Sequence, residues 1–178
     1  MRRVFVLAIG LAIAAPAHAH VTIEAQEARV GASFKAVVLS NQSGVARGLI
    51  TKEQLDAVHL RLRELLAEDG ARLDGIFICP HHPEDACACR KPAPGLVLRA
   101  QQELGLAPDR AIVIGDKASD VQLARNIGAT AVFVSSGHHP EEERARMMDQ
   151  NLVPDFTARD LAEAVKWILE KENVLVLE

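Results

Sequence analysis

All three cysteines of the chain lie within one short segment, residues 79–89, and a histidine lies among them. The pattern is Cys-x-His, then a short loop, then Cys-x-Cys. Thiolate sulfur and imidazole nitrogen are common ligands of tetrahedral Zn²⁺, and four such ligands fill its coordination shell. A filled shell leaves no position for a reacting water, so a metal bound here would be structural. The predicted zinc ligands are Cys79, His81, Cys87 and Cys89.

Other interpretations of this segment remain open. Two of the thiols could form a disulfide and leave the third free, or the cysteines could be buried apolar residues. His82 stands next to His81 and is an alternative nitrogen ligand. Arg90 and Lys91 directly follow the last cysteine, so a bound metal would fix the positions of two cations. Such a pair suits phosphate recognition, and Lys91 could neutralise charge on a transferring phosphoryl group.

Polar groups also follow two apolar runs that we expect to form strands. Ser40 ends the run 37–40, Asp116 follows the run 111–114, and Asp120 stands four residues later. Ligands of parallel sheets gather at the carboxyl ends of the strands, where a hydroxyl could bind phosphate oxygens. Carboxylates beside a phosphate favour Mg²⁺, so Asp116 and Asp120 are candidate ligands of that ion. The alternative is that the two acids are a loop residue and a helix cap.

Strand-like and helical patterns alternate along the chain after residue 36, which predicts an α/β fold with a parallel sheet covered on both faces. The first expected helix begins with a capping-box pattern, Thr51 with Gln54. The chain is long enough for one domain with a sizeable core. Strands are expected at 37–40, 76–78, 111–114 and 130–134, and helices at 52–68, 94–104, 121–127 and 157–169.

The composition excludes some classes of function. Hydrophobic residues make up 49% of the chain but aromatic residues only 3%, so the core must be aliphatic. The formal net charge is −4, which provides no field for holding nucleic acid nonspecifically.

Residues 1–19 have the form of an export signal. Two arginines precede an apolar run, 4–15, and Ala17-His18-Ala19 matches an Ala-x-Ala cleavage site. The run is too short to span a bilayer as a stable helix, so no membrane span is expected. The alternative is that residues 4–9 form a buried strand.

The sequence around residues 20–37 resembles the start of a periplasmic copper-binding β-sandwich family. The matching stretches are His-Val-Thr-Ile-Glu-Ala from His20 and Ala-Ser-Phe-Lys-Ala-Val from Ala32, and with the leader the likeness covers about residues 1–38. It implies an exported protein in which His20 could bind copper. Export would expose the three thiols to oxidation, which fits the rest of the chain poorly.

About residues 37–172 resemble the D-glycero-D-manno-heptose-1,7-bisphosphate 7-phosphatases of the haloacid dehalogenase superfamily, with histidinol-phosphate phosphatases as close relatives. The likeness rests on Leu-Ser-Asn-Gln-Ser-Gly-Val-Ala-Arg-Gly at 39–48, on the cysteine segment with its Arg-Lys-Pro, and on Gly-Asp-Lys at 115–117. It implies a three-layer Rossmann-like fold with a zinc-binding loop. It also implies a cytoplasmic, monomeric, Mg²⁺-dependent phosphomonoesterase. The implied reaction is hydrolysis of the 7-phosphate of D-glycero-D-manno-heptose 1,7-bisphosphate, on the path to the heptose of the lipopolysaccharide core. Histidinol phosphate is the alternative substrate, and the anomer is not decided.

The resemblance also implies a role for each matching residue. Ser40 and Lys91 would stabilise the phosphoryl group, and Arg90 would recognise the sugar bisphosphate. Asp116 would hold Mg²⁺, with Asp120 as a further candidate ligand. The remaining substrate-lining residues would be Asn41, Gln42, Ser43 and Lys117, and zinc would be held by Cys79, His81, Cys87 and Cys89.

One motif of the family is absent. Its first strand ends in Asp-x-Asp-Gly, whose first aspartate is the nucleophile and whose second is the acid and base. This chain contains no Asp-x-Asp, and its first aspartate is Asp56. Either a foreign leader, 1–36, is joined to a truncated phosphatase domain, 37–178, or residues 4–11 replace the missing strand, with Leu7 near the nucleophile position. Both explanations predict a chain without meaningful phosphatase activity, and a noncatalytic zinc-stabilised domain that binds phosphorylated sugars is the alternative class.

Overall fold

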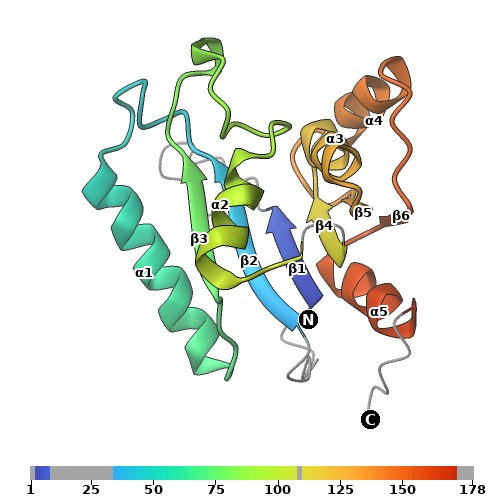
Figure 1. Cartoon of the computed structure of the whole chain (residues 1–178), viewed down its shortest axis with the longest axis horizontal. Helices are drawn as coiled ribbons and strands as arrows, with labels where there is room; N and C mark the ends of the chain where they lie inside the picture. The colour runs from blue at the N-terminus through green and yellow to red at the C-terminus, as the bar shows by residue number, and fades with distance from the viewer. Residues whose placement is uncertain (1–2, 9–33, 108–109, 172–178) are drawn as a thin grey trace.

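The computed structural model describes residues 3–8, 34–107 and 110–171. Its described strands form one sheet in the order β3-β2-β1-β4-β5-β6, and every neighbouring pair is parallel (Figure 1). The predicted α/β class with a parallel sheet is therefore confirmed. The strands are β1 (Arg3–Ala8), β2 (Phe34–Asn41), β3 (Gly75–Cys79), β4 (Ala111–Gly115), β5 (Thr130–Val134) and β6 (Phe156–Ala158).

Helices cover both faces of the sheet and make it the middle of three layers. On one face, Leu39 and Val113 pack in a buried cluster with α2 and α3. On the other face, Ile112 and Val132 pack against Ile168 of α5. Apolar side chains on both faces are what a parallel sheet requires. The helices are α1 (Lys52–Glu68), α2 (Gly95–Leu104), α3 (Ala118–Ile127), α4 (Pro140–Asp149) and α5 (Leu161–Lys171), with a 3₁₀ turn at Pro83–Asp85.

The helix ends follow local sequence signals. The Thr51 side chain accepts a hydrogen bond from the Gln54 amide, and the Gln54 side chain accepts one from the Thr51 amide, as the capping-box pattern predicts. Helix α3 ends at Gly128, which has a φ of 70° and so occupies the left-handed region that favours glycine. These signals explain why the first three helices end close to the predicted positions.

The C-terminal part differs from the prediction in two ways. The expected helix start at residue 157 is wrong, because Phe156–Ala158 pairs with β5 as the edge strand β6 and α5 begins only at Leu161. Helix α4 was not predicted. Only Glu143 and Met147 are buried in it, so its sequence lacks the apolar stripe that reveals a helix.

Strand β1 lies at the centre of the sheet, between β2 and β4. Leu7 is paired in register with Val38 on one side and with Ile114 on the other. The apolar N-terminal segment thus supplies a central strand, as in the alternative to the export-signal interpretation. The predicted cleavage site and the candidate copper ligand His20 lie outside the described residues.

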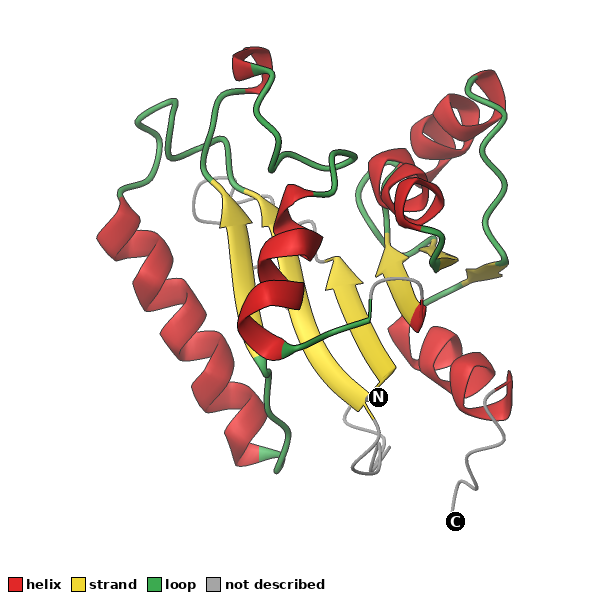
Figure 2. Ribbon diagram, viewed as in Figure 1, coloured by secondary structure: helices red, strands yellow, loops and turns green. Residues whose placement is uncertain are grey.

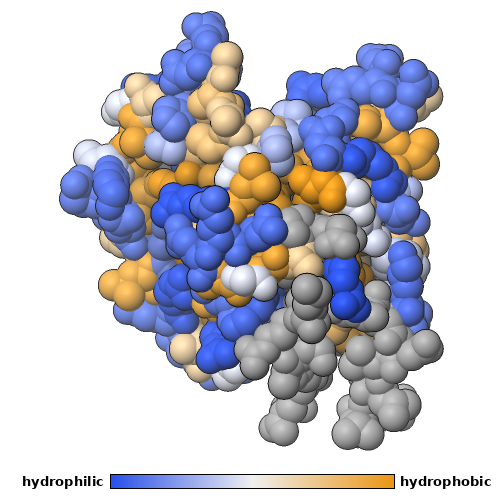
Figure 3. All heavy atoms as spheres, viewed as in Figure 1, coloured by the Kyte–Doolittle hydropathy of each residue, from blue (hydrophilic) through white to orange (hydrophobic). Residues whose placement is uncertain are grey.

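The loops that follow β2, β3 and β4 gather at the carboxyl ends of the strands, in the upper part of Figure 2. In the space-filling view, apolar residues show between the hydrophilic crests at the upper left and upper right (Figure 3). Among the described helices, none has the length and apolarity that a bilayer crossing needs. The site residues predicted from the sequence lie in the last residues of β2 and β3, in the loops that follow the strands, and at the start of α3.

Candidate functional site

The cysteine segment folds into a compact cluster at the end of β3. The Sγ atoms of Cys79 and Cys87 are 3.4 Å apart, and those of Cys87 and Cys89 are 3.6 Å apart. The fourth ligand atom, His81 Nδ1, lies 3.1 Å from Cys89 Sγ and 3.6 Å from Cys79 Sγ. Ligand atoms around a tetrahedral Zn²⁺ with ordinary bond lengths are separated by about 3.5 to 3.8 Å. The four side chains therefore fit one metal ion.

Two of the alternatives for this segment do not match the geometry. All three cysteines are free thiols, with no disulfide among them. His82 is used differently from His81, because its Nδ1 accepts a hydrogen bond from the Glu84 amide and caps the 3₁₀ turn. His81 is accordingly the histidine that joins the cluster.

Thiol ionisation in the cluster is uneven. Burial, reinforced by the nearby Cys89, raises the pKa of the Cys79 thiol to about 12. At Cys87, desolvation is outweighed by hydrogen bonds from the Cys79 and Cys89 thiols, and its pKa falls to about 7. A cation bound here would take the cysteines as thiolates, so its binding would release the remaining thiol protons.

Helix α2 packs directly against the cluster loop. The amide of Gly95 donates a 3.0 Å hydrogen bond to the Ala88 carbonyl. A Cβ atom at Gly95 would lie only 2.3 Å from that carbonyl oxygen, so the loop can approach the helix this closely only at a glycine. The contact ties the segment that carries Arg90 and Lys91 to the body of the fold.

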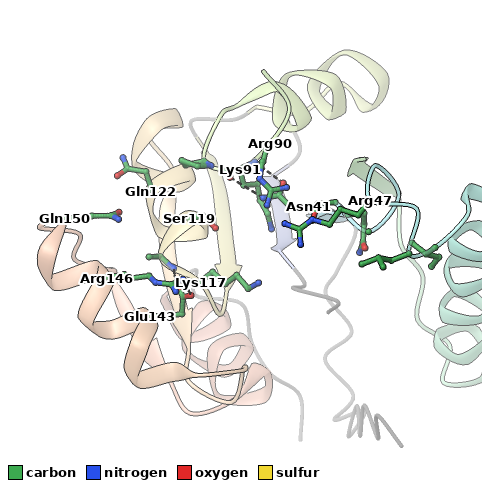
Figure 4. A pocket seen from close by; sticks show the side chains of 17 residues that line it. Asn41, Arg47, Arg90, Lys91, Lys117, Ser119, Gln122, Glu143, Arg146 and Gln150 are labelled. Carbon is green, nitrogen blue, oxygen red and sulfur yellow. Dashed lines mark hydrogen bonds and ion pairs between the residues drawn. The ribbon is translucent and has the colours of Figure 1, made fainter. Parts of the chain in front are cut away.

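A cavity of about 610 Å³ opens at the carboxyl ends of the strands. Figure 4 shows Asn41 and Arg47 on one side of it and Lys117, Glu143 and Arg146 on the other, with Arg90 between them. The structure thus brings six of the predicted site residues to one cavity. These are Asn41, Gln42, Ser43, Arg90, Lys91 and Lys117.

Lys91 is buried in the wall of this cavity. Its Nζ atom donates to the Leu39 carbonyl at 2.9 Å and lies 2.8 Å from Asp120 Oδ1. Burial raises the pKa of Asp120, and the charge of Lys91 opposes that shift. The other oxygen of Asp120 accepts a hydrogen bond from the Lys117 amide at 3.2 Å. Asp120 therefore pairs with the lysine and also caps α3.

Two further polar groups, on Ser40 and Arg90, are suited to an anion. The Ser40 hydroxyl accepts a 2.9 Å hydrogen bond from Gln42 Nε2, which leaves its own proton free to be donated elsewhere. Within the described part of the chain, the buried Nη1 of Arg90 has no hydrogen-bond partner. A buried guanidinium nitrogen without a partner is costly unless a ligand satisfies it.

Asp116 has the surroundings of a metal ligand. Its Oδ1 is buried and finds no hydrogen-bond partner among the described residues. A Cβ atom at Gly137 would lie 2.3 Å from the Asp116 side chain, so the carboxylate is closely packed on that side. A buried carboxylate oxygen with an unused lone pair fits a hard cation such as Mg²⁺. Ser40, Asp116 and Asp120 are not among the described residues that line the cavity.

Several lining residues were missed from the sequence. Glu143 is 7% exposed, and its Oε2 accepts a 2.9 Å hydrogen bond from the Ala118 amide at the start of α3. Arg146 Nη1 lies 2.6 Å from the other oxygen of Glu143. Both residues belong to the unpredicted helix α4, so no pattern connected them with the site. Arg47 also lines the cavity. Its place in the motif at 39–48, close to Ser40, could have marked it as a site residue.

Comparison with known proteins identifies the family. Residues 88–164 match a family model described as HAD-hydrolase-like. The D-glycero-β-D-manno-heptose-1,7-bisphosphate 7-phosphatase of Yersinia pestis is 40% identical over 142 residues, which are 75% of this chain and 73% of that protein. The chain belongs to this family of HAD-like phosphatases. The family resemblance predicted from the motifs is thereby confirmed.

Other members of the family match over different lengths. The D-glycero-α-D-manno-heptose-1,7-bisphosphate 7-phosphatase of Mycobacterium tuberculosis is 46% identical over 99 residues, and the chain spans only 50% of its length. A crystal structure of the D,D-heptose 1,7-bisphosphate phosphatase from B. bronchiseptica, complexed with magnesium and phosphate, superposes with a TM-score of 0.69. That alignment has 33% identity and covers 78% of this chain and 75% of the other.

Proposed function

We propose that the cavity binds D-glycero-D-manno-heptose 1,7-bisphosphate, a substrate of lipopolysaccharide core synthesis, in the cytoplasm. The observation that carries this proposal is Arg90, whose buried Nη1 has no partner among the described residues, next to the buried cation Lys91. Preformed cations in a partly dry site favour phosphate over neutral ligands. The relatives' names provide the heptose, and both anomers occur among them.

In this proposal the residues divide the work by their chemistry. Ser40 and Lys91 donate hydrogen bonds to the phosphoryl group, and Arg90 and Lys117 hold the rest of the bisphosphate. Asp116 holds Mg²⁺, and Asp120 keeps Lys91 in place. When bound, the magnesium ion offsets the negative charge of the phosphate ester. Zinc held by the four-residue cluster is structural and fixes the loop that carries Arg90.

We also propose that this chain binds the ester without hydrolysing it. An aspartyl nucleophile would stand on the central strand, and β1 occupies that place with Leu7 in register with Ile114. No aspartate precedes Asp56 in the sequence. The division into a leader segment, 1–36, and a phosphatase domain, 37–178, is proposed as a boundary of sequence origin only, because β1 and the first residues of β2 lie before it and belong to the sheet.

Calorimetric titration of the sugar bisphosphate tests binding, and a phosphate-release assay with Mg²⁺ tests turnover. We expect the ester to bind without release of phosphate. Arg90→Ala should weaken ester binding tenfold or more, because it removes a charge-assisted contact and each tenfold corresponds to about 1.4 kcal/mol. Arg99→Ala is the matched control, since Arg99 lies over the Phe77 ring and does not line the cavity. Equal binding by the two variants would refute the proposal, and steady phosphate release would refute the absence of turnover.

The same titration separates the alternative functions. Histidinol phosphate carries one phosphate and the heptose bisphosphate two. Tighter binding of histidinol phosphate would favour the alternative function, that of the related histidinol-phosphate phosphatases. Mass spectrometry of the purified N-terminus addresses location. An intact Met1 would support the cytoplasmic proposal, and a start at His20 would support export and the copper-binding alternative.

A further inference from the structure

The side chain of Asn41 makes two hydrogen bonds to the backbone of a single distant residue. Asn41 Oδ1 accepts from the Lys91 amide at 3.0 Å, and Asn41 Nδ2 donates to the Lys91 carbonyl at 3.2 Å. The two residues are fifty positions apart in the sequence. Two bonds from one planar carboxamide fix both the distance and the orientation of the peptide that they hold.

The last residues of β2 therefore hold both the backbone and the side-chain amino group of Lys91. The Leu39 carbonyl accepts from Lys91 Nζ, and Asn41 binds the Lys91 backbone. Lys91 lies in a loop, so no helix or strand hydrogen bonds set its position. Among the described residues, the contacts from β2 and the ion pair with Asp120 are what keep this cation in the cavity wall.

We propose that Asn41 is a positioning residue, which acts on a bound phosphate through Lys91 and not by touching the phosphate itself. The proposal rests on the proposed function, because it assumes that Lys91 contacts a phosphate. It differs from the role implied by the family resemblance, in which Asn41 lines the substrate. Its Oδ1 and one of its two Nδ2 hydrogens are engaged with the Lys91 peptide.

A double-mutant cycle distinguishes action through Lys91 from direct contact. The probe is inorganic phosphate, titrated into the full chain in the presence of saturating Mg²⁺. Asn41→Ala should weaken phosphate binding about tenfold, because two hydrogen bonds of ordinary strength are lost. In a Lys91→Met background the same replacement should have less than about a twofold effect. A tenfold effect in both backgrounds would mean that Asn41 contacts the phosphate, and would overturn the proposal.

A second replacement of the same type is the matched control. Asn126 Nδ2 donates to the carbonyl of Pro92, the residue after Lys91, from an exposed position on α3. Asn126→Ala should change phosphate binding by less than about twofold. The two hydrogen bonds that are lost, to the Pro92 carbonyl and from Gln122 Nε2, are both exposed, and the Lys91 peptide keeps its clamp. An equal loss in both variants would show a general effect of loosening the loop and would refute a specific role of Asn41.

Hydrogen exchange gives a readout that does not depend on phosphate. The Lys91 amide should exchange at least about tenfold faster in Asn41→Ala than in the wild type, whereas Mg²⁺ affinity should stay unchanged. Unchanged exchange at Lys91 would overturn the clamp even if Lys91→Met fails to fold. If the wild type binds no phosphate at all, the proposed function fails, and the accelerated exchange would then show the clamp to be structural only.

Discussion

At the scale of single residues, the site contains an ion pair, between Lys91 and Asp120, that is costly to bury. Both side chains are almost fully buried, at 4% and 3% exposure, and their charged atoms are 2.8 Å apart. Taking two charges out of water is costly, and the cost is recovered only while both partners are present. The pair therefore stabilises the fold and the position of the cation together.

Asp120→Asn tests this dependence. The replacement keeps the shape but leaves the Lys91 charge without its partner, and we expect the free energy of unfolding to fall by about 3 kcal/mol. Urea denaturation measures it. Asp56→Asn is the control, because it breaks a 2.6 Å ion pair with Lys52 at the exposed surface and should cause no measurable change. Similar losses in the two variants would mean that burial of the Lys91 pair contributes nothing.

A glycine beside Asp116 provides a second test at this scale. A methyl group at Gly137 would stand 2.3 Å from the Asp116 side chain, so Gly137→Ala should displace the carboxylate. We expect Mg²⁺ affinity to fall by tenfold or more, measured by calorimetry, because a misplaced ligand oxygen cannot complete the coordination shell. Gly44→Ala is the matched replacement and should keep its Mg²⁺ affinity, because its Cβ would meet Ile50 Cγ2 at 3.2 Å and Leu49 Cβ at 4.0 Å, both side-chain carbons. Undiminished Mg²⁺ binding in Gly137→Ala would contradict the role of Asp116.

At the scale of elements, the proposed zinc site predicts that the loop between β3 and α2 depends on its four candidate ligands. The purified chain should contain one zinc ion, and His81→Ala should lose most of it while His82→Ala keeps it, since only His81 joins the thiols. Elemental analysis of the three proteins checks this. We also expect His81→Ala to lower the melting temperature, because the loop then lacks the ion that joins its two ends. Equal zinc contents in the two histidine variants would contradict the ligand set.

A carboxylate directly before β6, Asp155, makes the stability of the β5–β6 region depend on pH. Partial burial acts to raise the pKa of Asp155, but hydrogen bonds from the Ala131 amide and from Arg125 outweigh it and hold that pKa below its ordinary value. Its contribution is therefore present above the unfolded pKa and is lost as the pH falls through the lower, folded pKa. Asp155→Asn should thus be less stable than the wild type at pH 7, with a difference that shrinks toward pH 3. A difference of constant size in denaturation curves would contradict this sign.

The predicted elements carry local sequence patterns, whereas the missed elements depend on contacts with distant parts of the chain. Strands such as β4, buried along its whole length, and helices with a cap and a glycine stop carry local patterns that a single sequence reveals. Helix α4 and strand β6 carry none, because α4 is largely exposed and the three residues of β6 are fixed by pairing with β5. Glu143 and Arg146 were missed with α4. The clamp of Asn41 on Lys91 joins residues far apart in the sequence, so only the fold could reveal it.

At the scale of the whole molecule, a sheet with a complete set of central strands is combined with a sequence that lacks the family's nucleophile. Strand β1 has the place and the parallel pairing of a catalytic strand, and Ala8 at its end is in register with Gly115, the residue before Asp116. In our proposal, the chain therefore lacks phosphatase activity because the catalytic side chains are missing, although the sheet that would hold them is present. A framework of this kind can be tested by supplying the missing groups.

The sequence Leu7-Ala8-Ile9-Gly10 makes that test direct. The double replacement Leu7→Asp with Ile9→Asp writes Asp-x-Asp-Gly into the sequence at residues 7–10, with a nucleophile and an acid–base group two residues apart. We expect this variant to release phosphate from the heptose bisphosphate only when Mg²⁺ is present. Ile9→Asp alone is the matched control and should release none, because it has no nucleophile.

A folded double variant that binds the ester and still releases no phosphate would show that more than the two aspartates is missing. Release by the single variant would contradict the assignment of the nucleophile position to Leu7. Trapping of a phosphorylated aspartate in the double variant, but not in the control, would identify the position directly, because the family mechanism passes through a covalent intermediate. The register of β1 against β4 would then be the property that makes the central strand competent for catalysis.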